Sequence, residues 1–265
     1  MKRRRMLQTA FLLPAALSLP AEARGEILFQ ATRCEGHYTK HLQGVCINDR
    51  DAVYWCWTDV LVKTDAQGRV LNQVPVANHH GDLCHHDGRV YVAVNLGRFN
   101  EAPGKADSWV YVYDADTLAE IARHPVPELV HGAGGIAFHD GRFIVVGGLP
   151  PGVNENYLYE YDEGFRFRKR HVLDSGYTLM GIQTAAYAGE AWWFGCYGKP
   201  AELLRADADF QYAGRWEFNA SLGIAPIDDN LFLIGQNTRV EDKGHEGRVV
   251  LAHTDEAAGL IFAKP

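Results

Sequence analysis

Polar side chains that can do chemistry recur where loops lead into short apolar strands. His41, His80 and His131 stand at such positions, and Asp82 and Gln183 lie close to others. Imidazoles titrate near neutral pH and bind zinc and other transition metals, whereas carboxylate and amide oxygens suit calcium. These residue types can therefore serve acid/base catalysis or hold a metal ion if the fold brings them together.

One set of these residues suits catalysis on a polar substrate. We expect His41 and His80 to act as acid and base, and Tyr197 to bind or polarise the substrate. A cation such as Arg98 would neutralise a carboxylate, as a lyase on uronic acids requires. The residues expected to bind the substrate are Gln43, His79, Asn95, Arg98, Gln183 and Gln236.

A second set suits a divalent metal ion. His41, His80, Asp82 and His131 offer ligands for zinc or, together with amide and backbone oxygens, for calcium. The alternative is that these groups bind ordered water and one another, as buried polar groups generally must. Both interpretations follow from the same residues.

The elements that must position these residues repeat along the chain. The aspartates that end one recurrent strand are spaced 45 to 49 residues apart. Aspartate accepts hydrogen bonds from backbone N–H groups in turns, so we expect a structural role for all five. The copies of the strand are Val60–Asp65, Trp109–Asp114, Tyr157–Asp162, Leu203–Asp207 and Val250–Asp255.

Each copy is preceded by a glycine-containing apolar strand, a polar turn and an aromatic or β-branched strand. The turns His-Asp-Gly-Arg at 86–89 and 139–142 have the chemistry of tight hairpins, because glycine accepts a positive φ. A fourth short strand follows each aspartate. Four short strands per unit, without a long amphipathic helix, are typical of a propeller blade. Five units predict an all-β, five-bladed β-propeller with four-stranded antiparallel blades.

A ring of five blades must also be closed, since an open blade edge presents unpaired backbone groups to other chains. Residues 26–30 could add a strand to the last blade, and Gly259–Ala263 could equally supply it.

The strings HLQG, HHGDL, HGAGGI and GIQTA resemble those of an uncharacterised group of secreted bacterial β-propeller proteins. The resemblance covers most of residues 35–255. It implies the propeller fold and no particular activity.

In a propeller the first strand of each blade lines the central channel, so the residues leading into these strands gather at one mouth. Aligning the glycines of the first strands gives His41 and His131 equivalent positions and places Gln43 and His80 two residues further on. Strand alternation would turn both sets to one face. We therefore expect the functional site, and any calcium or zinc ion, at this mouth of the channel.

The first 23 residues are typical of an export signal. They contain the basic run Lys2–Arg5, an apolar stretch at Ala10–Leu19 and the small-residue pattern Ala21-Glu22-Ala23. The basic run resembles the twin-arginine pattern, so that route and ordinary secretion are both open. Residues 24–265 would then form a single domain that is periplasmic or secreted and has no membrane anchor.

Charge narrows the class of partner. The chain has 26 Lys+Arg and 33 Asp+Glu, and removal of residues 1–23 would leave 22 and 32, a net charge of −10. Such a surface repels a phosphate backbone, which argues against nucleic acid. We expect a monomer whose partner is a small-molecule or carbohydrate ligand.

The cysteines are odd in number and lack zinc-ribbon spacing, which predicts buried free thiols for most of them. An oxidising compartment would allow one disulfide. The five are Cys34, Cys46, Cys56, Cys84 and Cys196.

The favoured function is an exported enzyme, a hydrolase or lyase acting on a carbohydrate-like substrate. The alternatives are a non-catalytic ligand- or carbohydrate-binding propeller and a protein-interaction scaffold. A multivalent lectin would repeat its pocket in every blade, whereas here the loops differ, with His79-His80 in one blade and Cys196-Tyr197 in another. One asymmetric site at the channel fits this pattern better than five equal ones.

Overall fold

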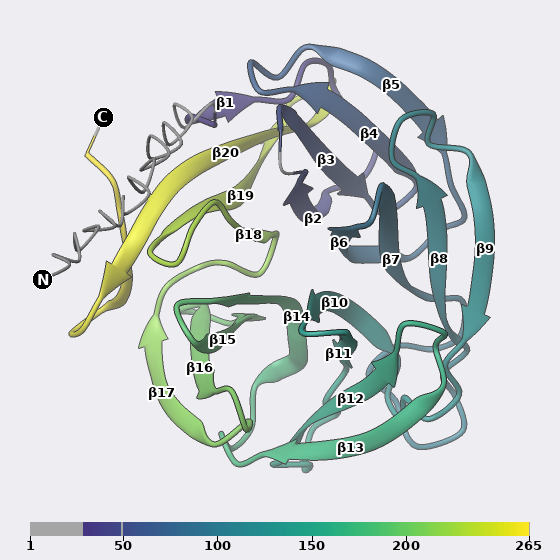
Figure 1. Ribbon diagram of the computed structural model, residues 1–265, viewed down its shortest axis with the longest axis vertical. Helices are drawn as coiled ribbons and strands as arrows, with labels where there is room; N and C mark the ends of the chain where they lie inside the picture. The colour runs from purple at the N-terminus through teal and green to yellow at the C-terminus, as the bar shows by residue number, and fades with distance from the viewer. Residues whose placement is uncertain (1–28, 49, 265) are drawn as a thin grey trace, which may run out of the picture.

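The computed structural model describes residues 29–48 and 50–264. The export signal expected in residues 1–23 lies outside the described residues. Within the described part the chain is all-β, and its strands form five sheets arranged as blades around a central axis (Figure 1). The five-bladed propeller predicted from the repeat is confirmed. None of the described residues forms a helix long and apolar enough to cross a membrane.

Each of the first four blades contains four antiparallel strands in chain order from the channel outward. Blade 1 consists of β2 (Leu42–Ile47), β3 (Ala52–Trp57), β4 (Val60–Asp65) and β5 (Val70–Pro75). Blade 2 consists of β6 (His80–His86), β7 (Arg89–Asn95), β8 (Ser108–Asp114) and β9 (Glu120–Pro125). Blade 3 consists of β10 (Ala133–His139), β11 (Arg142–Gly147), β12 (Asn156–Asp162) and β13 (Phe167–Leu173). Blade 4 consists of β14 (Leu179–Ala188), β15 (Ala191–Tyr197), β16 (Glu202–Asp207) and β17 (Tyr212–Glu217).

Blade 5 joins the two ends of the described chain. Its inner strands are β18 (Ile224–Pro226), β19 (Leu231–Val240) and β20 (Gly244–Asp255). The outer edge of β20 pairs with β1 (Thr32–Arg33) at Val249 and Arg248, and with β21 (Gly259–Phe262) further along. The sequence offered either residues 26–30 or Gly259–Ala263 as the closing strand. The structure uses β21 together with a strand that begins two residues after Gln30.

Turn chemistry sets the limits of the strands. The Oδ1 atom of Asp65 accepts hydrogen bonds from the backbone N–H groups of Gln67 and Arg69, at 3.0 and 2.9 Å. The same bonds recur at the ends of β8, β12, β16 and β20, which confirms the structural role predicted for the aspartates. In the two His-Asp-Gly-Arg hairpins the Asp and Gly both have positive φ, as a type I′ turn requires.

The hydrophobic core is divided into five clusters, one at each seam between neighbouring blades. Trp55 and Trp57 are fully buried between blades 5 and 1, and Trp192 and Phe194 are fully buried between blades 3 and 4. The aromatic side chains of these strands therefore pack neighbouring blades against each other, as the sequence predicted. All five cysteines are free thiols, and four of them are buried.

Closure of the ring depends on a close backbone contact at Gly68. This residue has a φ of +83°, and a Cβ atom placed on it would lie 1.8 Å from the carbonyl oxygen of Arg33 in β1. Gly68 also accepts a hydrogen bond from the backbone N–H of Glu35. A side chain at this position would push the closing segment away from blade 1.

We expect Gly68→Ala to lower the free energy of unfolding by about 3 kcal/mol or more, because backbone overlap adds to the strain of a positive φ. Gly88→Ala is the matched control, since Gly88 has a φ of +68° and open space around it. It should cost only about 1 kcal/mol. Urea unfolding of both variants checks this, and equal losses would contradict the role given to Gly68.

Candidate functional site

The channel is narrowed to a waist where the backbones of the inner strands touch. A Cβ atom on Gly81 would lie 2.3 Å from the carbonyl oxygen of Gly134, and one on Gly135 would lie 2.6 Å from that of Gln183. On Gly44 it would lie 2.4 Å from the Oδ1 atom of Asp82. Side chains are excluded at these positions because neighbouring blades approach too closely.

Asp82 crosses the channel at this waist. Its side chain starts on β6, and its Oδ2 atom accepts a hydrogen bond from the backbone N–H of Ala185 on β14 at 3.1 Å. The residue is 1% exposed, and its Oδ1 atom has no hydrogen-bond partner. Burial raises the pKa of the Asp82 carboxyl well above its ordinary value, so the neutral acid is favoured.

The waist divides the channel into two cavities with separate walls. We name the first the loop-side cavity, because it lies where loops lead into the inner strands; its volume is about 370 Å³. We name the second the turn-side cavity, because it lies beside the hairpin turns that follow the inner strands; its volume is about 670 Å³. Both volumes fall in the range of small-molecule sites.

The loop-side cavity gathers most of the residues that the sequence singled out. They come from blades 1, 2 and 4, which are far apart along the chain. The predicted residues that line it are His41, Gln43, His79, His80, Asn95, Gln183 and Tyr197. Phe99, in the loop between β7 and β8, and Met180, near the start of β14, complete its apolar wall. Neither side chain offers an acid, a base or a metal ligand, so the sequence pattern did not predict them.

His41 is held by a network at the start of β2. The side-chain amide of Gln43 donates to the Nε2 atom of His41 at 3.1 Å and to the Oγ1 atom of Thr58 at 3.2 Å. The ring of His245 lies edge-on, 6.3 Å away between ring centres. Burial, followed by the charges of His245 and Lys40, lowers the pKa of His41. The neutral imidazole is therefore favoured near neutral pH.

His80 is fully buried in the cavity wall and has no free ring nitrogen. Its Nδ1 atom donates to the carbonyl oxygen of Ala77 and its Nε2 atom accepts from the hydroxyl of Tyr113, both at 2.7 Å. The ring is fully buried and packs edge-on against Tyr111. Burial lowers the pKa of His80 to about 4. The geometry thus gives this residue a structural role, in contrast to the acid/base role expected from the sequence.

Two amides hold the cavity walls in place. The Oδ1 atom of Asn95 accepts from the backbone N–H of Asp107, and its Nδ2 atom donates to the carbonyl oxygen of Gly97. Asn95 therefore ties together the two ends of the loop that carries Phe99. The Nε2 atom of Gln183 donates to the carbonyl oxygen of Met180 at 2.8 Å and holds the start of β14 beside the cavity.

Tyr197 and His79 lie at the edge of the cavity. Tyr197 ends β15, opposite Leu179 on β14, and burial raises the pKa of its hydroxyl to about 12. The phenol is therefore protonated over the whole neutral range. His79 is exposed and has a φ of +67°, which turns the chain sharply into β6.

Four predicted residues lie outside the loop-side cavity. Gln236 accepts a hydrogen bond from Arg248 on the neighbouring strand, and the Nδ1 atom of His131 donates to the carbonyl oxygen of Glu101. Asp82 lies at the waist, and the exposed Arg98 is absent from the cavity wall. Strand alternation placed His131 beside His41, but the inner strands carry register shifts near Gly44, Gly81 and Gly134 that interrupt the alternation.

The expected metal cluster is not formed. Among residues 29–48 and 50–264, no group of three or more His, Cys, Asp or Glu side chains is arranged to hold a metal ion. His80 uses both ring nitrogens, and Asp82 directs one oxygen to Ala185 and the other against Gly44. His41, His80, Asp82 and His131 therefore do not fit a zinc or calcium ion.

Comparison with known proteins adds similarity of fold only. No protein-family model matches the chain, and no curated protein matches it. The solved structure of Kuenenia stuttgartiensis hydrazine synthase is 12% identical, with a TM-score of 0.49, over 81% of this chain and 65% of that chain. The quinohemoprotein alcohol dehydrogenase from Comamonas testosteroni is 13% identical, with a TM-score of 0.44, over 89% of this chain and 45% of that chain.

A protein of unknown function from Desulfotomaculum acetoxidans is 11% identical, with a TM-score of 0.47, over 85% of this chain and 69% of that chain. The chain thus spans less than two thirds of the first two structures. At these identities the likeness carries nothing about activity.

The buried carboxyl at the waist makes stability depend on pH. Folding raises the pKa of Asp82, so the protonated carboxyl contributes to the free energy of unfolding below the unfolded pKa of about 3.9. This contribution is lost as pH rises, by up to about 1.4 kcal/mol per pH unit. We expect the stability of Asp82→Asn relative to wild type to increase as pH rises from 4 to 7. Urea unfolding at several pH values tests this, and a constant difference would contradict it.

The buried imidazole of His80 changes stability with pH in the opposite direction. Its pKa falls from about 6.5 in the unfolded chain to about 4 in the folded protein. The contribution of the neutral imidazole to the free energy of unfolding is therefore present above pH 6.5 and is lost as pH falls toward 4. Over that window the loss amounts to about 3 kcal/mol. We expect the advantage of wild type over His80→Gln to shrink by that amount on acidification. An advantage that grows at low pH would refute the assignment.

Proposed function

We propose that the loop-side cavity binds an uncharged, carbohydrate-like ring that carries an apolar substituent. The observation that supports this is the chemistry of the cavity wall. Among the described residues that line it there is no Asp, Glu, Lys or Arg. A charged ligand would lose its hydration there without gaining a partner of opposite charge.

The polar groups of the wall suit hydroxyl groups. The imidazole of His41 and the amides of Gln43 and Gln183 offer hydrogen-bond donors and acceptors without net charge. The apolar side chains Phe99 and Met180 lie on other parts of the same wall. A sugar-like ring with an apolar group attached would satisfy both kinds of surface.

Acid/base catalysis on the same ligand is the second candidate. The neutral imidazole of His41 can act as a base once Gln43 releases its Nε2 atom, and the protonated phenol of Tyr197 is an acid at the same cavity. This pair replaces the pair of His41 and His80 expected from the sequence. Arg98 is absent from the wall, so a uronic acid would lack the cation that a lyase uses. Hydrolysis of a neutral glycoside is therefore the reaction we favour within this candidate.

The setting of the function is also part of the proposal. We propose that the protein works outside the cytoplasm, as a monomer without a bound nucleic acid or membrane anchor. The support is the pattern of residues 1–23, which is typical of an export signal, and the excess of acidic residues.

The probe 4-nitrophenyl β-D-glucoside tests the proposal, since it joins an uncharged sugar to an apolar ring. We expect saturable binding of one molecule per chain in isothermal titration calorimetry. Gln43→Met should weaken binding about 3- to 10-fold, because it removes one or two neutral hydrogen bonds and releases His41.

Gln73→Met is the matched control, since Gln73 is an exposed glutamine on the outer strand of blade 1, and binding should be unchanged. Release of 4-nitrophenolate that falls as His41 becomes protonated would establish the catalytic candidate. Binding without release would establish a binding protein. The absence of saturable binding by folded wild type would refute both.

A further inference from the structure

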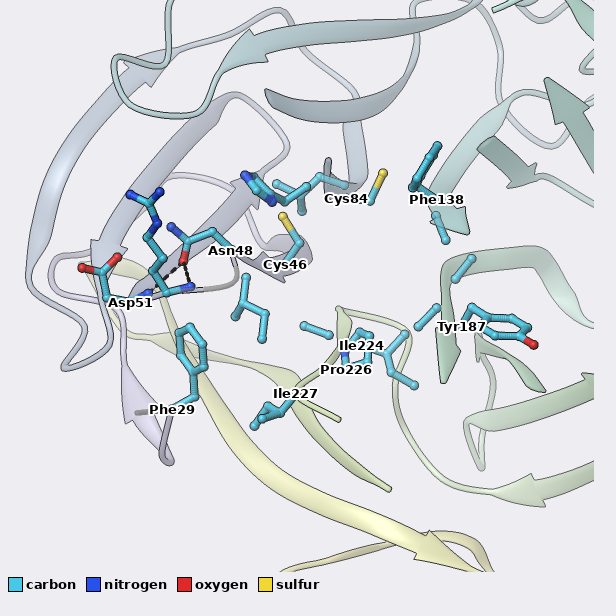
Figure 2. Close-up of a pocket in the computed structure, with 18 residues that line it drawn as sticks. Phe29, Cys46, Asn48, Asp51, Cys84, Phe138, Tyr187, Ile224, Pro226 and Ile227 are labelled. Atoms are coloured by element: carbon cyan, nitrogen blue, oxygen red, sulfur yellow. Dashed lines mark hydrogen bonds between the residues drawn. The ribbon is translucent and has the colours of Figure 1, made fainter. Parts of the chain in front are cut away.

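The loop-side cavity continues outward over an exposed apolar surface, and the turn-side cavity does not. At the mouth of the loop-side cavity, Tyr177, Leu179 and Met180 are 36%, 46% and 37% exposed. We name these three side chains the apolar rim. The large apolar side chains that line the turn-side cavity are all buried or half-buried, as Ile224 and Ile227 are (Figure 2).

The apolar rim is continuous with the wall of the loop-side cavity. Met180 belongs to both, because it lines the cavity together with Phe99. Leu179 begins β14 and pairs with Tyr197 of β15, which is another residue of the wall. An apolar group that binds against Met180 can therefore extend onto Leu179 as it leaves the cavity.

Hydrogen bonds hold the rim in its exposed position. Thr178 is fully buried, and its hydroxyl donates to the Oδ1 atom of Asn156 at 3.0 Å. The carbonyl oxygen of Tyr177 accepts from Arg215 at 2.9 Å, and that of Thr178 accepts from the backbone N–H of Gly181 at 3.2 Å. These polar contacts fix the segment with its threonine inward and the apolar side chains toward solvent. Adjacent apolar side chains displayed beside a cavity are typical of a binding surface.

A linear apolar chain is the occupant that fits this rim. Three side chains offer too small an area for a stable protein interface, which buries about 800 Å² per partner. An anionic lipid surface would repel a chain with 26 Lys+Arg and 33 Asp+Glu. The cavity volume of about 370 Å³ is near the lower limit for small-molecule sites. A sugar ring with a long substituent would therefore extend beyond the cavity and onto the rim.

We propose that the loop-side cavity and the apolar rim together bind an uncharged alkyl glycoside. The sugar lies in the cavity, and the alkyl chain runs along Met180 and Leu179. This inference rests on the proposed function and narrows its ligand to one class. The chain gains free energy by leaving water and needs no polar partner on the rim.

Methyl, butyl, hexyl and octyl β-D-glucosides, each below its micelle-forming concentration, test this in isothermal titration calorimetry with wild type. Full burial of one CH₂ group would strengthen binding about fourfold. Because the rim covers only one side of the chain, we expect about a twofold gain per CH₂ group. This measurement does not depend on the folding of a variant.

Leu179→Ser tests the rim itself, since it removes an exposed apolar side chain. It should weaken the binding of octyl glucoside about three- to tenfold more than that of methyl glucoside. Leu71→Ser is the matched control, because Leu71 is 59% exposed on the outer strand β5 of blade 1. It should leave the gain per CH₂ group unchanged.

The outcomes separate this inference from the function on which it rests. Equal affinities along the series, together with saturable binding of 4-nitrophenyl β-D-glucoside, overturn the inference alone. The absence of saturable binding of any of these glucosides overturns the proposed function as well. If sedimentation velocity shows that Leu179→Ser dissociates a wild-type dimer, the rim is a contact between copies of this chain, and the inference is overturned.

Discussion

The inner strands of the five blades can come together around one axis only where no bulky side chain separates their backbones. At the waist this is achieved by Gly44, Gly81 and Gly135, which let neighbouring blades touch, and by Asp82, which joins β6 to β14 across the channel. The contact has an electrostatic cost, since a carboxyl with one unpartnered oxygen is held away from water. The waist lies between the two cavities, which share no described lining residue.

The waist also explains why the two mouths differ in chemistry. On the loop side, the wall takes His41 from the segment before β2, Gln43 from β2 itself and Phe99 from the loop between β7 and β8. On the turn side, the wall combines small residues of the inner strands with Asn48, Arg50 and Asp51 from the turn between β2 and β3. The two mouths therefore present different sets of side chains.

The repeat in the sequence was sufficient to predict the blades, because aspartate turns and type I′ hairpins are local. It was also sufficient to bring His41, Gln43 and Gln183 to one mouth, since topology alone decides which loops gather there. It could not orient His80, whose ring is directed by a register shift in β6 and by Tyr113, a residue 33 positions away. Side-chain direction at a bulge depends on contacts that no local pattern encodes.

Closure of the ring through blade 5 has a consequence for the order of events during synthesis. The pairing of Thr32 with Val249 joins segments that are made at opposite ends of translation. Until β20 is available, the face of blade 1 that carries Trp55 and Trp57 has no neighbour to cover it. The blade that leaves the ribosome first is thus the last to be shielded from water. This apolar face therefore stays exposed until the last blade is complete, which favours aggregation of incomplete chains.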